Sequence, residues 1–116
     1  MQAEFGGLAY TVVNPDELRR RLAHGETFSI VDARSDDAYG ASGQTVASAI
    51  RIRPDDLQRR KNEIPRGRTL LLVADDDVAE SMAMGLLADG YTDVWLIEGG
   101  FDAWLRAGGS TEPARL

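Results

Sequence analysis

One segment, residues 69–74 with the sequence TLLLVA, constrains the fold more than any other feature of the chain. Successive side chains of a β-strand point to opposite faces of its sheet, so an apolar run without polar alternation is buried on both faces. Such a strand is typical of the centre of a parallel sheet that helices cover on both sides. The segment therefore predicts a protein of the α/β class.

Strands and helices are expected to alternate along the rest of the chain. The first helix is marked by Asn14, which can cap it, and by Pro15, which suits its first turn. The other expected elements are strands over residues 28–32, 49–52 and 94–97 and helices over residues 54–64, 78–89 and from 100 onward. This alternation indicates a parallel sheet between two layers of helices.

Length and composition indicate one domain. The 116 residues contain no internal repeat and no linker rich in Pro, Gly or Ser, which predicts a single domain over residues 1–116. Its core is expected at about residues 10–108, with loose termini on both sides. The absence of an apolar run long enough to cross a bilayer, and of a secretory signal pattern, favours a cytoplasmic location.

The chain contains no cysteine and one histidine, His24. Disulfides, zinc-thiolate sites and thiol nucleophiles are therefore excluded, and so is a histidine-rich metal site. We expect no cofactor. The net charge of −6 argues against nucleic acid or an anionic membrane as the main partner, because both require a concentrated positive surface. The local arginine clusters at 19–21 and 59–61 fit solvated helix faces, with docking of an acidic protein as the alternative.

In parallel sheets of this kind, ligands bind beyond the carboxyl ends of the strands. The segments that follow Asp32, Ala74 and Ile97 are therefore the first places to look for a site.

These segments also carry motifs of a known family. Asp32-Ala33-Arg34 resembles the "D-x-R" of rhodanese-like domains, and residues 39–49 are similar to the family's "E-Y-x-x-G-H-I-x-G-A". In that stretch Gln44 stands in place of the histidine and Ser48 in place of the second glycine. Residues 90–104 match the closing "G-Y-x-x-V…G-G-x-x-x-W". The resemblance implies a rhodanese-like, three-layer α/β/α fold with a central, mostly parallel sheet of about five strands.

The family's catalytic loop, "C-x-x-G-x-R-S", follows the central strand. The corresponding residues here are Asp75, Asp76, Asp77, Val78, Ala79, Glu80 and Ser81. The resemblance thus places Asp75 at the nucleophilic cysteine and Glu80 at the arginine. An aspartate cannot carry a persulfide, and clustered carboxylates repel anionic sulfur donors. We therefore expect no catalytic residue and no sulfurtransferase activity.

The interpretation that follows is an inactive rhodanese-homology domain that acts as a regulatory or protein-binding module. One alternative is divalent-cation-dependent activity or sensing at the loop, with Asp75 and Asp76 as the candidate ligands, since carboxylates suit Mg²⁺ and Ca²⁺. In a variant of that alternative, Asp75 accepts a phosphoryl group. A second alternative is a sulfurtransferase with an unrecognised nucleophile.

The acidic loop also has a purely structural interpretation, in which Asp77 caps the following helix and Glu80 completes a capping box. If the loop has a recognition role, its negative charge favours a basic partner. Three residues are expected at the edge of the pocket: Asp32, Arg34 and Gln44. The first two are expected to organise the surrounding loops. Phe101 and Trp104 are expected to anchor the core.

Overall fold

The fold is built on a six-stranded sheet with the order β1-β2-β7-β6-β3-β5. The computed structural model describes residues 2–5 and 8–115. The strands of this sheet are β1 (Gln2–Phe5), β2 (Leu8–Val13), β3 (Phe28–Asp32), β5 (Ile50–Arg51), β6 (Thr69–Val73) and β7 (Val94–Ile97). Strand β1 runs antiparallel to β2, and the other neighbours pair in parallel. The expected class, a mostly parallel α/β sheet, is confirmed.

Strand β6 lies inside the sheet, between β3 and β7. Its side chains alternate between two apolar cores. Leu70 and Leu72 pack into the core on one face, while Leu71 and Val73 pack into the core on the other. Because neither face of β6 meets water, both sets of positions are apolar, as the sequence predicts.

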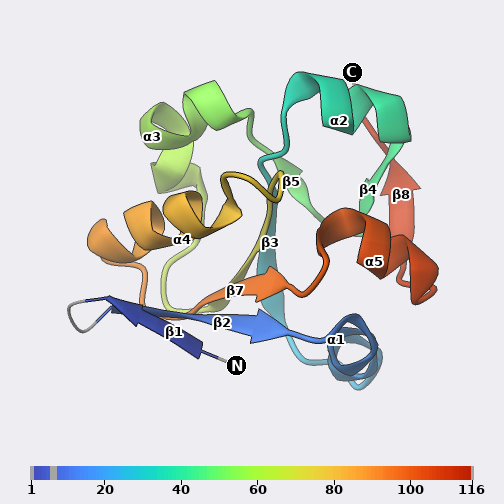
Figure 1. The fold of residues 1–116 in the computed structure, drawn as a ribbon, viewed down its shortest axis with the longest axis horizontal. Coiled ribbons are helices and arrows are strands. Elements are labelled where there is room, and N and C mark those ends of the chain that lie inside the picture. Colours follow the sequence, from blue (N-terminus) through green and yellow to red (C-terminus); the bar gives the residue numbers. More distant parts are fainter. Residues whose placement is uncertain (1, 6–7, 116) are drawn as a thin grey trace.

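Helices cover both faces of the sheet, which makes three layers (Figure 1). On one side lie α1 (Pro15–Ala23) and α5 (Gly100–Arg106), which contribute Leu18, Phe101 and Trp104 to the core. On the other side lie α3 (Leu57–Arg60) and α4 (Ala79–Ala88). The side chain of Asn14 accepts hydrogen bonds from two amides of the first turn of α1, as expected of the cap.

The helix expected over residues 54–64 is broken into three short pieces: η1 (Pro54–Asp56), α3 and η2 (Lys61–Glu63). Leu57 and Ile64 nevertheless point inward and are buried. Burial of these two side chains positions the segment, because a single helical turn has little stability of its own.

Paired strands lie near both ends of the described residues. The expectation of loose ends is wrong, because β1 pairs with β2 and because β8 (Thr111–Pro113) pairs with β4 (Gln44–Val46) in a second, two-stranded sheet. Figure 1 shows β8 beside β4. Just after β8, the backbone N–H of Arg115 donates to the hydroxyl of Tyr39 on α2 (Asp36–Ser42). The tail is held by backbone hydrogen bonds that its composition does not reveal.

The turn after β4 contains a residue in a strained backbone conformation, Ser48. Ser48 has a φ of 70°, in the left-handed region that glycine occupies without a steric penalty. Ser48→Gly is expected to raise the free energy of unfolding by about 0.5 kcal/mol, because relief of strain outweighs the added entropy of the unfolded chain. Ala47→Gly, one residue earlier, should lower it. Urea denaturation of the two variants checks the difference, and a loss of stability in both would contradict this explanation.

Candidate functional site

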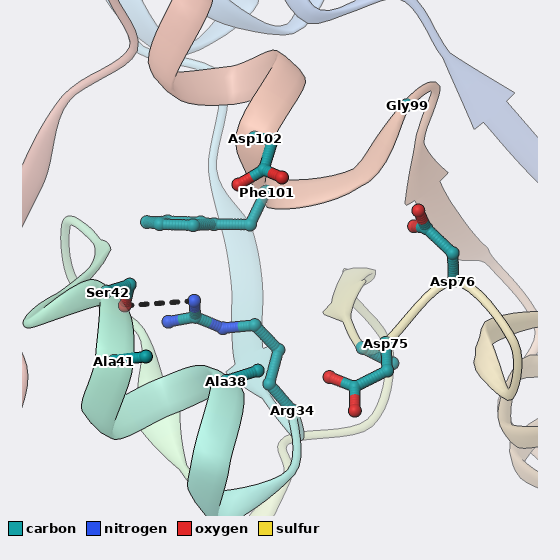
Figure 2. A pocket seen from close by; sticks show the side chains of 10 residues that line it. Arg34, Ala38, Ala41, Ser42, Asp75, Asp76, Gly99, Phe101 and Asp102 are labelled. Carbon is teal, nitrogen blue, oxygen red and sulfur yellow. Dashed lines mark hydrogen bonds between the residues drawn. The ribbon is translucent and has the colours of Figure 1, made fainter.

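A pocket of about 450 Å³ lies where the carboxyl ends of β3, β6 and β7 meet. It is lined by Arg34, Ala38, Ala41, Ser42, Ala74, Asp75, Asp76, Gly99, Phe101 and Asp102. Figure 2 shows these side chains arranged between α2, the loop after β6 and the start of α5. The segments after Asp32, Ala74 and Ile97, which were expected to carry the site, thus come together around one space.

Asp75 stands two residues after the end of β6 and is half-buried at the wall of this pocket. One carboxylate oxygen accepts a hydrogen bond from the backbone N–H of Ser35 at 3.2 Å. The backbone carbonyl of Asp75 accepts from the amides of Val78 and Ala79, both at 3.0 Å. The loop after β6 therefore folds back onto the backbone carbonyl of Asp75. The amides of Val78 and Ala79 donate to this carbonyl and not to a ligand.

Asp76 lies against the beginning of α5. A Cβ atom placed on Gly100 would stand 2.6 Å from Oδ1 of Asp76, and the φ of 71° at Gly100 lies in the left-handed region that favours glycine. Asp102, in the first turn of α5, also lines the pocket. The pocket thus carries three carboxylates, from Asp75, Asp76 and Asp102 (Figure 2).

Arg34 is the cation that lines the pocket, but its charge is neutralised by the buried carboxylate of Asp32. Its guanidinium donates to both carboxylate oxygens of Asp32, with the shortest contact at 2.7 Å. It also donates to Oγ of Ser42 and to the carbonyl oxygen of Gln44. Asp32 is fully buried and accepts a further hydrogen bond from Thr45. This network joins β3, α2 and β4 into one rigid edge of the pocket.

Phe101 covers the other side of Arg34. The centre of the guanidinium lies 4.0 Å from the centroid of the Phe101 ring, which is a cation–π contact. Phe101 is therefore both a buried core residue and part of the pocket wall. Trp104 is also buried, away from the pocket, where its indole N–H donates to the carbonyl oxygen of Ser110.

Other residues singled out in the sequence lie outside the pocket lining. Gln44 is exposed, and its side-chain oxygen accepts a hydrogen bond from Thr111 of β8. Asp77, Glu80 and Ser81 are exposed on the loop and on α4. Among the described residues there is no group of three or more His, Cys, Asp or Glu side chains arranged to hold a metal ion.

The structural role expected for Asp77 and Glu80 is wrong. Helix α4 is capped by Val78, without a side-chain hydrogen bond, so Asp77 does not act as the cap. Glu80 instead accepts a hydrogen bond from the hydroxyl of Tyr10 on β2. That hydrogen bond and the burial of the ring raise the pKa of the Tyr10 hydroxyl. Glu80 therefore links α4 to the sheet.

Sequence reasoning did not place α2 and Asp102 at the site. Ala38, Ala41 and Ser42 come from α2, a seven-residue helix capped by the side chain of Ser35. The pattern Ser35-Asp36-Asp37, a capping residue followed by acidic residues, could have indicated its start.

Comparison with known proteins agrees with this geometry. A profile of the rhodanese-like domain family matches residues 14–107. The chain therefore belongs to the rhodanese-like domain family, and it contains no cysteine. A comparison with curated proteins found no significant match.

Solved structures share the fold. The Alr3790 protein from Anabaena sp. is 29% identical, with a TM-score of 0.72 over 87% of this chain and 82% of that one. A solution structure of the rhodanese-like domain of the same protein gives 29% identity and a TM-score of 0.71, over 87% of this chain and 77% of that one. A full-length protein from Lactobacillus plantarum, 14% identical, has a TM-score of 0.75 over 88% and 87% of the two chains, a likeness of fold alone. No helix within the described residues is long and apolar enough to span a membrane.

Proposed function

We propose that this domain is a non-catalytic member of the rhodanese-like family that acts as a regulatory module by binding a protein. The observation that carries the proposal is Asp75, which stands two residues after the end of β6 with its carboxylate on the wall of the pocket. A persulfide needs a thiol at the reacting position, and no thiol exists anywhere in the chain.

The pocket is also unsuited to the anionic sulfur donors of sulfur transfer. Its lining holds three carboxylates against one guanidinium, and that guanidinium is bound to Asp32. An entering anion would meet like charges without a free cation, and two amides of the loop are taken by the carbonyl of Asp75. The nucleophile and the means of holding its substrate are thus both lacking.

The same charges suit a basic partner. The side chain of a lysine has an apolar stem that could pack on Phe101, Ala38 and Ala41, while its ammonium group meets the carboxylates. Opposite charges across an interface speed the encounter and select the partner. The proposed ligand of the pocket is therefore a lysine-containing segment of another protein.

An assay of sulfur transfer tests the first half of the proposal. Thiosulfate and cyanide should yield no thiocyanate above the uncatalysed rate, because no group can carry the transferred sulfur. As a control, a variant whose residues 75–80 are replaced by a rhodanese loop with its cysteine and arginine should remain folded. Turnover by the unaltered chain would overturn the proposal.

Peptide binding tests the second half. In an amide NMR titration with a tetralysine peptide, we expect saturable shifts at residues 75–81 and 99–102. The variants Asp76→Asn and Asp102→Asn should each weaken binding by about two- to fivefold, the effect of one exposed charge pair. Asp55→Asn, an exposed acid on η1, is the matched control and should change nothing. Shifts with Mg²⁺ or Ca²⁺ but not with the peptide would favour a cation site instead.

A further inference from the structure

A second pocket, of about 330 Å³, lies between α2, β5, α3 and the C-terminal tail. The pocket described above, lined by Asp75, Asp76 and Asp102, is called the acidic pocket. The lining of the second pocket includes instead three arginines, Arg51, Arg60 and Arg115, and one acid, Glu112. Such a concentration of positive charge is unexpected in a chain with a net charge of −6. Arg115 lies far from Arg51 and Arg60 in the sequence, so only the fold brings it beside them.

Arg51 is held in place before any ligand arrives. Its guanidinium lies 4.1 Å from the centroid of the buried Tyr39 ring. It donates to the backbone carbonyls of Asp32 and Arg34, the latter at 2.6 Å, and to the carboxylate of Asp36. Asp36 also pairs with Arg53, and Arg51 forms a second, longer ion pair with Asp32 at 4.0 Å, whose carboxylate is itself bound to Arg34. Two carboxylates therefore face three guanidinium groups. The Arg51 side chain is thus both fixed and incompletely compensated.

Arg60 is similarly oriented. It pairs with Glu63 at 2.8 Å and donates to the backbone carbonyl of Arg51 at 3.4 Å. The second of these contacts places its guanidinium beside the Arg51 backbone.

Arg115 completes the pocket from the tail. Its backbone N–H donates to the Tyr39 hydroxyl at 2.8 Å, which fixes the tail beside α2. Within residues 2–5 and 8–115, no salt bridge involves its side chain, which is exposed. Its guanidinium is therefore available to a ligand.

We propose that this pocket binds the phosphate group of a small phosphate monoester. Guanidinium groups match the oxygens of phosphate in charge and in geometry and form paired hydrogen bonds with them. A phosphate monoester presents three strong acceptor oxygens, one more than a carboxylate. It can therefore accept from Arg115, which has no salt bridge within the described residues, and also from Arg51 and Arg60, which are each already paired with an acid. The volume admits the phosphate and a small organic group attached to it.

An amide NMR titration with inorganic phosphate and with O-phosphoserine tests the proposal. We expect saturable shifts at Tyr39, Arg51 and Arg115 and none at residues 75–81, with much weaker binding of acetate. Arg115→Ala should weaken binding by about three- to tenfold, whereas Glu112→Gln should strengthen it by about two- to fivefold. Arg106→Ala and Glu98→Gln, exposed residues away from the pocket, are the matched controls and should leave the affinity unchanged.

The outcomes separate this inference from the proposed function. If neither phosphate compound causes saturable shifts, or if the two pocket variants behave like their controls, the inference is wrong and the proposed function is unaffected. If phosphate shifts residues 75–81, the inference is wrong and so is the argument that the pocket at Asp75 repels anions.

Discussion

Asp32→Ala is expected to lower the free energy of unfolding by about 3–5 kcal/mol, because it leaves the buried charge of Arg34 without its partner. Asp32 is 0% exposed and Arg34 is 4% exposed. The carboxylate accepts hydrogen bonds from the Arg34 guanidinium, the Arg34 backbone amide and the Thr45 hydroxyl. Since small domains are stable by about 5–15 kcal/mol, this change alone removes a large share of the total.

Urea denaturation followed by circular dichroism measures the effect. Asp37→Ala is the matched control, because Asp37 is exposed on the first turn of α2, and its loss should be within about 1 kcal/mol. Asp32→Ala combined with Arg34→Met should recover part of the stability, since the double variant no longer buries a charge. A single variant as stable as the control would show that water reaches Arg34 and that the network does not organise the pocket.

Trp104→Ala is expected to destabilise the domain by about 3–5 kcal/mol, the usual loss when a large buried aromatic side chain is removed. Trp104 is 1% exposed and packs in the core between the sheet and helices α1 and α5. Its indole N–H donates to the Ser110 carbonyl at 3.0 Å. A Cβ on Gly109 would lie 2.0 Å from the indole ring, so the tail passes directly over it. The variant therefore loses both a core anchor and the contact that leads the tail into β8.

Leu105→Ala is the matched control for this prediction. Leu105 is the next residue of α5 and is 36% exposed, so its truncation should cost about 1 kcal/mol or less. Thermal unfolding of both variants checks the difference. Because Phe101 and Asp102 lie on the same helix, Trp104→Ala should also broaden the amide signals around the acidic pocket. Equal stability of the two variants would mean that α5 is not anchored through Trp104.

Much of the architecture could be predicted from local patterns of apolar and turn residues in the sequence. The apolar residues of β6 require burial on both faces, and the turn residues around Gly90 and Gly99 separate α4, β7 and α5. The missing cysteine is a matter of composition and needs no structure at all. These features are recognisable because hydrophobic periodicity and residue type depend only on near neighbours along the chain.

Other features depend on contacts between distant segments and could not be predicted in that way. The tail after Gly108 reads as a loose end, yet it forms β8 because the edge of β4 offers unpaired backbone groups. Asp77 has the residue type of a helix cap, but α4 begins after Val78, and Glu80 in the first turn of α4 accepts a hydrogen bond from Tyr10 of β2. A cap contributes only about 1 kcal/mol, so a local preference of this size is easily overridden.

The sequence alone therefore establishes the α/β class, the resemblance to rhodanese-like domains and the loss of the thiol. The tertiary structure decides which charged side chains lie close together. It gathers Asp75, Asp76 and Asp102 around one pocket and sets Arg51 and Arg115 beside another. The physical reason is that the burial of apolar side chains fixes the path of the backbone, and this path brings charged side chains from distant segments together even where they repel one another.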